Sequence, residues 1–363
     1  MSLFNVDKDI SIAETLPAEF YTDEKYFELS KNKIFSKSWQ YACDTDKAKV
    51  SGQIHPFTLL EKYLDEPLII TRDKSDRLNC LSNVCTHRGN ILVEGNCIEK
   101  NISCRYHGRR FDLDGKFISM PGFDEVKNFP SKKDNLPEIP FDTWEKFLFV
   151  SLNPVSPIRN FIGDMCSRMS WLPLNEFIYQ PARSRDYLVN AHWALYCENY
   201  LEGFHIPYVH NSLNNVLDYS NYKTELFQFS NLQIGIGKNG EDCFDLPKDS
   251  DDYKNYGNNI SAYYFWIFPN LMFNFYPWGL SINIIRPLKK DLTKVSFLTY
   301  VWDESKIDKG SGAGIDKVER EDEAIVENVQ IGINSRSYDR GRYSVKHERG
   351  THHFHRIIAE FIG

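Results

Sequence analysis

Two Cys-His pairs carry the most distinctive chemistry in this sequence. Cys85 and His87 form the first pair, Cys104 and His107 form the second, and a glycine closely follows each histidine. Thiolate and imidazole groups bind soft and borderline metals. Two of each could hold a tetrahedral zinc ion or a [2Fe–2S] cluster with two sulfur and two nitrogen ligands. Structural zinc sites usually pair Cys with Cys and His with His along the chain, so one Cys and one His in each loop favours the cluster.

These Cys-x-His and Cys-x2-His loops resemble those of the Rieske iron–sulfur family. The resemblance implies that Cys85 and Cys104 bind one iron of the cluster and that His87 and His107 bind the other. One residue departs from the pattern, because Arg109 stands where many relatives carry an aromatic residue after His-Gly. This departure leaves the four ligands unchanged. It affects instead the hydrogen bonds around the cluster and the cluster's redox properties.

A second set of candidate ligands lies near the middle of the chain. His205 and His210 stand five residues apart, and Asn199 and Glu202 precede them at three-residue intervals on a predicted helix. We expect this helix to bend or end near Pro207, which could bring His210 back toward His205. Two histidines and a carboxylate form the facial triad of non-heme Fe(II) oxygenases. The alternative is that both histidines are ordinary helix-end residues.

The run Glu-Asn-Tyr-Leu-Glu-Gly-Phe-His-x4-His, which ends at His210, resembles the mononuclear iron motif of the large subunit of Rieske non-heme iron oxygenases. The resemblance implies that His205 and His210 bind iron. It also gives Glu202 the place of an aspartate that bridges toward the cluster of a neighbouring subunit. Glutamate there is a departure that recurs in the branch acting on quaternary ammonium compounds. We take Glu202 and Asn199 as catalytic candidates.

The carboxylate that completes this site is predicted in a helix over residues 316–335. The apolar residues of this helix fall on a stripe about 100° wide, formed by Val318, Ile325, Val326, Val329 and Ile333. Asp322 lies inside the stripe, where a carboxylate is costly unless it is paired or bound to a metal. The family pattern Asp-x4-Glu-x2-Gln also begins at Asp322. We therefore predict Asp322 as the third ligand, with its neighbour Glu321 as the alternative.

The remaining patterns predict an α+β fold with an arm and two domains. Residues 1–37 read as an N-terminal arm that packs on the catalytic domain and contains a helix over residues 23–36. Residues 38–155 contain short strands separated by turns, as expected for the small antiparallel β domain that the Rieske resemblance implies. The strands are predicted at residues 52–60, 63–72, 77–84 and 144–152, with a hairpin at residues 111–117.

Residues 156–363 form the predicted catalytic domain that would hold mononuclear Fe(II). Aromatic and β-branched residues alternate through residues 263–287 and again through residues 294–302, which indicates successive antiparallel strands. A long helix follows, so the expected architecture is helix-grip-like, with an antiparallel sheet and a long C-terminal helix. The aromatic residues 263–278 could also form a box for a trimethylammonium group through cation–π attraction, although most of them should be core residues.

We assign no bound ligand to two further motifs. Gly235, Gly237 and Gly240 spell the G-x-G-x-x-G pattern of a dinucleotide site, but no helical pattern follows directly, so we interpret the motif as a turn. The C-terminal run that contains His352, His353 and His355 reads as surface residues, and it also resembles a family tail that packs rather than coordinates. With no site for NAD or flavin, the electrons must come from another protein.

The composition excludes several classes of protein. The formal charge is 43 − 50 = −7 without long basic runs, which disfavours nucleic-acid binding. No segment approaches the roughly 20 apolar residues of a membrane span. The N-terminus lacks the apolar core of a signal peptide, and the eight cysteines then read as thiols and metal ligands. We expect a cytoplasmic protein.

The two resemblances together imply an oxygenase component that uses O2 to hydroxylate or demethylate a small organic substrate. Its electrons would come from a separate NAD(P)H-dependent reductase or ferredoxin, and the family resemblance implies a homotrimer. Glu202 favours a quaternary ammonium substrate related to choline, betaine or carnitine. The alternatives are an aromatic ring-hydroxylating dioxygenase, an O-demethylase, or an electron-transfer Rieske protein. The second iron motif disfavours the last of these, because a carrier needs only the cluster.

Overall fold

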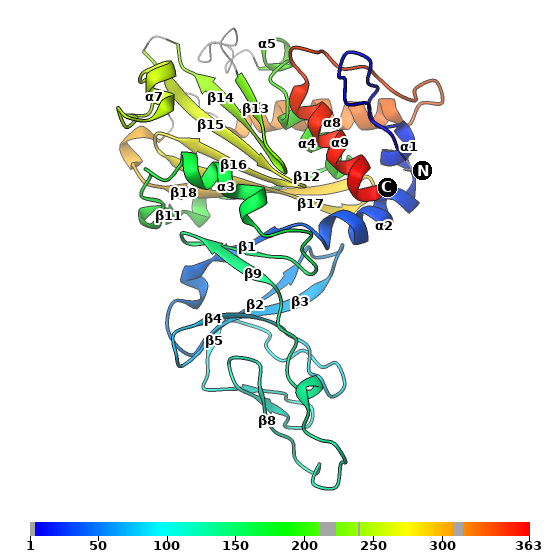
Figure 1. Ribbon diagram of the computed structural model, residues 1–363, viewed down its shortest axis with the longest axis vertical. Coiled ribbons are helices and arrows are strands. Elements are labelled where there is room, and N and C mark those ends of the chain that lie inside the picture. Colours follow the sequence, from blue (N-terminus) through cyan, green and yellow to red (C-terminus); the bar gives the residue numbers. More distant parts are fainter. Residues whose placement is uncertain (1–3, 211–222, 239, 308, 310–314) are drawn as a thin grey trace. The chain divides into compact units, whose positions relative to one another are not determined.

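The computed structural model describes residues 4–210, 223–238, 240–307, 309 and 315–363 of the 363-residue chain. It divides into two compact units (Figure 1). The smaller unit is the continuous segment Ser36–Val155. The larger unit combines Met1–Phe35 with Ser156–Gly363. Among the described residues, no helix combines the length and the apolar character that crossing a membrane requires.

The smaller unit consists of short antiparallel strands in three sheets. The first sheet has the order β1 (Gln40–Asp44), β10 (Phe147–Val150) and β9 (Phe141–Trp144). The second has the order β4 (Leu78–Ser82), β3 (Glu66–Arg72), β2 (Gln53–Leu59) and β5 (Cys97–Ile98). The third has the order β6 (Ile102–Ser103), β7 (Arg110–Phe111) and β8 (Phe117–Ser119). These strands confirm the predicted antiparallel β character, and β2, β3 and β4 occupy the three strand segments expected between residues 52 and 84.

The strand predicted over residues 144–152 is present but shorter, as β10 at Phe147–Val150. It forms a hairpin in which β9 ends at Trp144 and β10 begins at Phe147. Glu145 takes a positive φ of 51° in the tight turn between them, so the extended run is broken where the residue types gave no turn signal.

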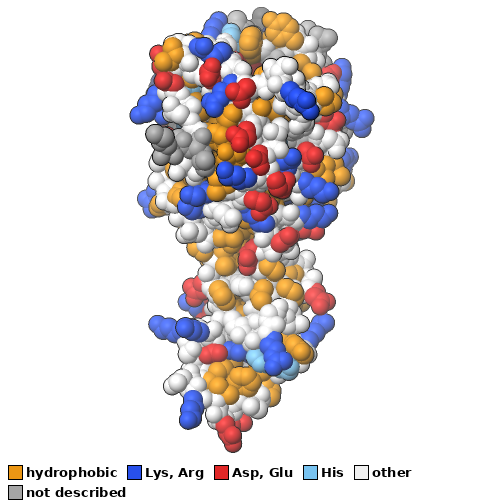
Figure 2. All heavy atoms as spheres, turned by 90° about the vertical axis from the view of Figure 1, so that its right-hand side faces the viewer, with side chains coloured by type: hydrophobic (Ala, Val, Ile, Leu, Met, Phe, Trp, Pro, Cys, Tyr) orange, Lys and Arg blue, Asp and Glu red, His pale blue; other side chains and the backbone are white. Residues whose placement is uncertain are grey.

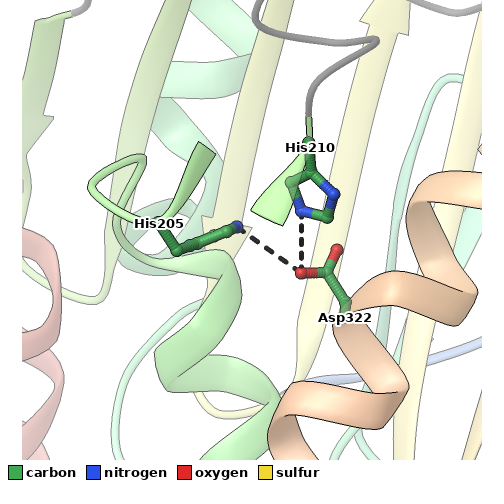
Figure 3. A group of neighbouring side chains, drawn as sticks. All are labelled: His205, His210 and Asp322. Atoms are coloured by element: carbon green, nitrogen blue, oxygen red, sulfur yellow. Dashed lines mark hydrogen bonds and ion pairs between the residues drawn. The ribbon is translucent and has the colours of Figure 1, made fainter. Parts of the chain in front are cut away.

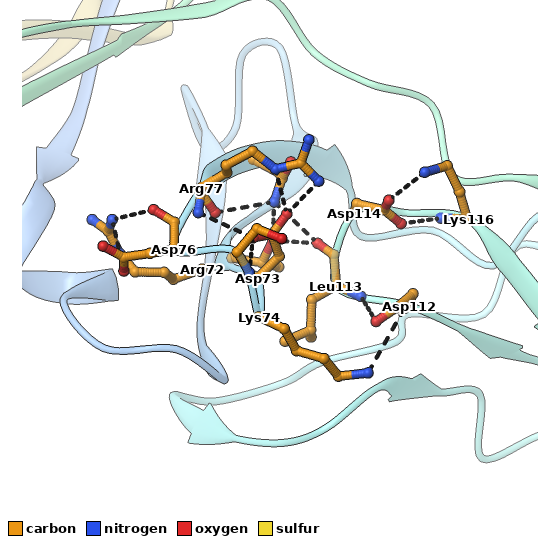
Figure 4. Close-up of polar contacts among 12 residues, drawn as sticks. Arg72, Asp73, Lys74, Asp76, Arg77, Asp112, Leu113, Asp114 and Lys116 are labelled. Atoms are coloured by element: carbon orange, nitrogen blue, oxygen red, sulfur yellow. Dashed lines mark hydrogen bonds and ion pairs between the residues drawn. The ribbon is translucent and has the colours of Figure 1, made fainter.

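A polar cluster fixes the β7–β8 hairpin to the second sheet (Figure 4). Thr71 of β3 donates its hydroxyl to the backbone oxygen of Leu113 at 2.5 Å. Next to it, the carboxylate of Asp73 accepts from the backbone of Ser75 and pairs with Arg77 at 2.8 Å, which holds the β3–β4 turn. Because β7 directly follows the second Cys-His loop, these contacts position that loop on the sheet.

In its described residues, the larger unit is built on one antiparallel sheet of eight strands. The strand order is β11 (Ile178–Tyr179), β18 (Leu292–Val301), β17 (Gly279–Lys289), β16 (Leu271–Tyr276), β15 (Ile260–Ile267), β14 (Ser230–Ile236) and β13 (Lys223–Leu226), and β12 (Arg185–Val189) also pairs with β18. The predicted strands over residues 263–287 and 294–302 correspond to β15–β18. Many residues at the centre of the sheet are apolar and buried, as in Phe265, Phe273 and Phe275, which explains why most of the aromatic run is core.

Helices cover this sheet. They are α3 (Arg159–Arg168), α4 (Trp193–Tyr200), α5 (Ile206–Val209), α7 (Asp251–Tyr256), α8 (Ile315–Ile333) and α9 (Arg349–Ile362). The N-terminal residues contribute α1 (Ala18–Thr22), α2 (Glu24–Ser30) and a π-helical turn at Lys31–Phe35. Helix α4 contacts both β17 and α8, so it lies between the sheet and the long late helix (Figure 1). The predicted α+β class, with a long helix on an antiparallel sheet, is confirmed.

The N-terminal residues pack against the C-terminal part of the larger unit. A backbone bridge joins Glu14 to Arg342, and the Nε2 of His352 bonds the backbone oxygen of Asp7 at 2.7 Å. His352 and His355 are therefore buried, at 6 % and 1 % exposure, and the interpretation of this run as surface residues is wrong. They were misjudged because their burial depends on an arm far away in the sequence.

The buried face of α8 also differs from the predicted stripe. Val326 and Ile333 are buried as expected, but Ile325 and Val329 are 38 % and 43 % exposed. The buried side instead follows residues 319, 322, 326, 330 and 333, with the three- and four-residue steps of one helix face. Three of these five residues are polar, and this is why apolar periodicity alone placed the centre of the face incorrectly. Asp322 lies on the inner side in both versions.

Candidate metal centres

The two Cys-His loops of the smaller unit have the same backbone construction. In the first, the N–H of Gly89 donates to the oxygen of Cys85 at 3.0 Å, and in the second the N–H of Gly108 donates to the oxygen of Cys104 at 3.0 Å. Both glycines have a positive φ, 72° and 75°, which other residues adopt only with strain. The two loops are therefore matched tight turns, each of which presents one Cys and one His.

The side chains of these loops lie in two pairs, one of thiols and one of imidazoles. Cys85 and Cys104 are 2 % exposed and belong to one apolar core cluster. The rings of His87 and His107 lie 4.8 Å apart between centroids and are half-buried. Histidine side chains reach the surface of this unit among hydrophobic and basic side chains (Figure 2). The arrangement has thiols inside and imidazoles toward solvent.

An unpaired buried atom supports a cofactor at this position. The Nδ1 of His107 is buried and has no hydrogen-bond partner among the described residues. A buried ring nitrogen without a partner carries a desolvation cost that metal coordination would remove. Burial also raises the pKa of the Cys85 thiol, and bound iron would favour its thiolate form. The donor set of two thiols and two imidazoles fits a Rieske cluster.

The second candidate site depends on a break between two helices of the larger unit. Helix α4 ends at Tyr200 and five residues separate it from α5, so the break precedes the position expected near Pro207. Pro207 instead lies in the first turn of α5, where a missing N–H costs nothing. The irregular segment between the helices turns the chain, and the rings of His205 and His210 come to lie 5.1 Å apart between centroids.

His205, His210 and Asp322 form one compact group (Figure 3). Their candidate ligand atoms all lie within 4.8 Å of one another. The Nε2 atoms of both rings point at the same carboxylate oxygen, Oδ1 of Asp322, at 3.5 Å from His205 and 3.0 Å from His210. His210 is 1 % exposed and Asp322 is 13 % exposed at the side chain. Two imidazoles and one carboxylate on one side of a site are the donors of a non-heme iron centre.

Two more carboxylates hold the outer nitrogens of these rings. Glu202 Oε1 lies 2.7 Å from Nδ1 of His205, and Glu321 Oε2 lies 2.8 Å from Nδ1 of His210. A neutral imidazole has one N–H, so donation from Nδ1 leaves a lone pair at each Nε2. Both lone pairs then face the oxygen of Asp322, an arrangement that a cation between them would stabilise.

The pKa of His210 reflects the same surplus of negative charge. Burial by itself disfavours the charged ring, but hydrogen bonds and charge interactions with Asp322 and Glu321 outweigh it and raise the pKa. The site therefore attracts positive charge. Glu321, the alternative third ligand, takes the outer position on His210 rather than a place in the group of three. Asn199 lies half-buried in α4 and has no hydrogen bond with another described side chain of this group.

One acidic residue at this site was missed by the sequence analysis. Glu319 lies one helical turn before Asp322 on α8 and accepts a hydrogen bond from the hydroxyl of Tyr196 at 2.5 Å. Burial and the nearby charge of Asp322 raise the pKa of Glu319 to about 8. The sequence signal for the inward position of Glu319 was the three- and four-residue spacing of residues 319, 322, 326, 330 and 333. Three of these residues are polar, so apolar periodicity did not reveal this face.

An aromatic group lies on the sheet face that carries α4. Tyr264 of β15 and Tyr276 of β16 share this face, with ring centroids 5.9 Å apart, and Trp278 stacks on Tyr276 at 5.2 Å. Tyr200 at the end of α4 donates to Asn274 on the same face at 2.6 Å, which places the helix over these rings. Burial is the main cause that raises the pKa of Tyr276, and charge interactions with Tyr264, Tyr200 and Glu319 raise it further. Glu319 therefore lies near enough to this aromatic group to interact with it electrostatically.

Comparison with known proteins gives two family matches. The model of the Rieske [2Fe-2S] domain matches residues 38–130. The model of the ring hydroxylating alpha subunit (catalytic domain) matches residues 178–363, which is more than half of the chain. The first match contains both Cys-His loops, and the second contains the group of His205, His210 and Asp322.

Curated relatives align over nearly the whole chain. Choline monooxygenase from Arabidopsis thaliana, whose name includes the word chloroplastic, is 29 % identical over 95 % of this chain and 82 % of the relative. The carnitine monooxygenase oxygenase subunit of Escherichia coli (strain K12) is 26 % identical over 96 % of this chain and 94 % of the relative.

Solved structures share the fold. The quaternary ammonium Rieske monooxygenase CntA in complex with L-carnitine has a TM-score of 0.76 at 21 % identity and covers 98 % of this chain and 97 % of that chain. A naphthalene 1,2-dioxygenase with indole bound has a TM-score of 0.73 at 16 % identity over 99 % and 95 %. The chain therefore belongs to the alpha subunits of Rieske ring-hydroxylating oxygenases, O2-dependent oxidoreductases with a [2Fe–2S] cluster and a mononuclear iron.

Proposed function

We propose that this oxygenase hydroxylates small quaternary ammonium compounds at a carbon next to nitrogen. The observation that carries this proposal is the presence of an aromatic group, Tyr264, Tyr276 and Trp278, on the sheet face under α4, together with the half-buried acid Glu319 near the iron ligands. Aromatic faces attract a trimethylammonium group by about 0.5–2 kcal/mol per good contact. A cation bound nearby would also favour the ionised form of Glu319, whose charge then adds attraction. The relatives named for choline and carnitine support the same substrate class.

We further propose site roles for this chain's residues. His205, His210 and Asp322 would hold the mononuclear iron, and Cys85, His87, Cys104 and His107 would hold the cluster. The iron supplies O2 activation and the cluster supplies electrons. Glu202 and Glu321 keep the Nδ1 protons of the two histidines in place, which fixes their orientation and leaves Nε2 for the metal. The aromatic group would exclude water around the cationic end of the substrate.

The overall reaction balances as a monooxygenation. One atom of O2 enters a C–H bond next to nitrogen, and the other leaves as water with two electrons and two protons. Where the hydroxylated carbon then loses its bond to nitrogen, the products are a tertiary amine, an aldehyde and a proton. The electrons would come from a separate reductase or ferredoxin, since the sequence holds no recognisable dinucleotide site. A cytoplasmic location stays a prediction.

Product analysis tests the substrate class. With a surrogate reductase and O2, we expect mass spectrometry to detect one added oxygen or a released aldehyde from choline, betaine or carnitine. The control substrate is 3,3-dimethylbutanol, which has the shape of choline without its charge. Glu319→Gln keeps the size of the side chain but cannot ionise. At about pH 9, above the raised pKa of Glu319 of about 8, KM for the cation should therefore rise about tenfold while KM for the neutral control stays constant. Turnover of simple aromatic acids in place of every cation would refute the substrate class and leave the oxygenase assignment standing.

We also propose that the chain works as a homotrimer in which Glu202 lies on the route from a neighbouring subunit's cluster. The support is the position of Glu202, whose Oε1 contacts Nδ1 of His205 and whose Oε2 accepts from the backbone N–H of His205 at 3.1 Å and from the N–H of Phe204. These bonds hold the carboxylate against the outer side of a metal ligand. The family resemblance supplies the neighbouring subunit.

Glu202→Gln should therefore slow electron delivery without removing either cofactor. The amide keeps the shape but loses the charge that holds the Nδ1 proton of His205, so we expect cluster reoxidation during turnover to slow by about 100-fold. Stopped-flow absorbance of the reduced protein mixed with O2 and substrate measures this rate. Glu360→Gln, at an exposed acid of α9, is the matched control. Wild-type rates in Glu202→Gln would show that Glu202 is only a solvated acid.

A further inference from the structure

Arg109 places a positive charge inside the smaller unit, two residues after His107. Its side chain is only 2 % exposed, and it is among the largest fully buried side chains of the described residues. Its backbone oxygen accepts from the N–H of Cys104 at 2.8 Å, so the residue closes the second Cys-His loop. A guanidinium stays protonated in a protein, and burying one is costly unless other groups compensate it.

Aromatic rings enclose this charge. The guanidinium carbon lies 5.0 Å from the ring centroid of Phe117, 5.5 Å from that of Phe129 and 5.7 Å from that of Phe111. These distances are within the range of cation–π attraction. The Nε of Arg109 is buried and has no hydrogen-bond partner among the described residues. The site keeps a cation in apolar surroundings although one of its donors remains unsatisfied.

Among the described residues, one acid forms an ion pair with Arg109. The Nη2 donates to Oδ1 of Asp134 at 2.6 Å and to its backbone oxygen at 3.2 Å. The other carboxylate oxygen accepts from the N–H and hydroxyl of Ser131 at 2.7 and 3.0 Å. The side chain of Asp134 is 20 % exposed, ten times the exposure of its partner. Water therefore screens the negative charge of this pair better than the positive one.

The ion pair of Arg109 and Asp134 also connects the two Cys-His loops by hydrogen bonds. Thr86, between Cys85 and His87, donates its hydroxyl to the backbone oxygen of Asp134 at 2.9 Å. That oxygen thus accepts from the first loop through Thr86 and from the second loop through Arg109. The guanidinium consequently has a fixed position relative to the four ligand side chains.

We propose that Arg109 is a positioning residue that raises the reduction potential of the Rieske cluster through its buried positive charge. Reduction adds one negative charge to the cluster, and a fixed cation enclosed with it in a low-dielectric environment stabilises that charge. The consequence is a cluster that accepts electrons from its reductase more readily than one without this residue. The proposal concerns the cluster alone and is independent of the substrate.

Two substitutions with opposite expected effects test the proposal by protein-film voltammetry at fixed pH. Arg109→Met fills the space between the phenylalanine rings and removes the positive charge, so the potential should fall by the equivalent of about a tenfold shift in the reduction equilibrium, 59 mV for one electron. Asp134→Asn removes the screened negative charge and should raise the potential. Arg109→Lys keeps the charge and should retain most of the wild-type value.

The matched control is Arg110→Gln, which removes the same charge from the adjacent, exposed arginine that bonds only Asn101 among the described residues. This control should change the reduction potential by only a small fraction of the shift expected for Arg109→Met. A merely structural role would loosen the loops in both Arg109→Met and Asp134→Asn and shift their potentials in one direction. That result, or equal shifts in Arg109→Met and Arg110→Gln, would overturn the proposal. If Arg109→Met does not retain the cluster, the reduction potentials of Asp134→Asn and Arg109→Lys decide whether the proposal holds.

Discussion

The Asp322→Ala variant should purify with its cluster and about two iron atoms per chain, where the wild type should hold about three. Asp322 is the carboxylate on which Nε2 of His205 and Nε2 of His210 both converge, so its removal leaves two neutral nitrogens as the remaining donors of the group. Turnover should fall to background. Iron analysis together with the visible spectrum of the cluster separates this loss from general unfolding.

Neighbouring acids of α8 provide the controls for Asp322. Glu323 is the next residue along the helix and lies outside the group of three, so Glu323→Ala should bind iron normally. Glu321→Ala removes the acceptor at Nδ1 of His210 and should weaken iron binding by about 10- to 100-fold, less than the loss of a ligand. Normal iron content in Asp322→Ala, with loss in Glu321→Ala, would identify Glu321 as the ligand instead.

Cys85→Ser should abolish the brown colour and the EPR signal of the cluster, and activity with them. Cys85 is 2 % exposed in the core cluster of the smaller unit, and a serine hydroxyl does not replace a soft thiolate at iron. Cluster binding also stabilises the fold around it, so thermal unfolding of the smaller unit should shift to lower temperature. Cys97→Ser, at a half-buried cysteine that packs against the same core, is the control and should keep wild-type spectra. An unchanged spectrum in Cys85→Ser would remove Cys85 from the ligand set.

The two Cys-His loops were predictable from the sequence because their information is local. Two short spacings specify Cys85, His87, Cys104 and His107, and matched glycines allow the tight turns. Strands were predictable for a related reason, since alternating aromatic and β-branched residues mark β15–β18 directly. The hairpin turn at Glu145 was not predictable from the sequence, because no Gly, Asn or Pro occurs in it.

Other parts of the site depend on contacts between distant segments. The roles of Glu321 and Glu319 depend on His210 and Tyr196, which reach α8 from other helices. Apolar periodicity misplaced the face of α8 because it scores Glu319 and Gln330 as exposed. In the fold, Gln330 accepts from the backbone N–H of His192 at 2.8 Å and is only 5 % exposed. A polar residue can be buried at little cost when a tertiary partner satisfies it.

The contacts between the N-terminal arm and the last helix also determine an order of assembly. Leu16 donates its backbone N–H to His355 across a sequence separation of 339 residues, whereas Ser36–Val155 is one continuous segment with its own internal contacts. Contacts between distant residues form slowly because a long loop must first close, and synthesis proceeds from the N-terminus. We therefore expect the segment with the four proposed cluster ligands to fold during synthesis, before the arm can pack against the last helix. Asp322, the proposed third ligand of the mononuclear iron, emerges much later, so the smaller unit would complete its site first.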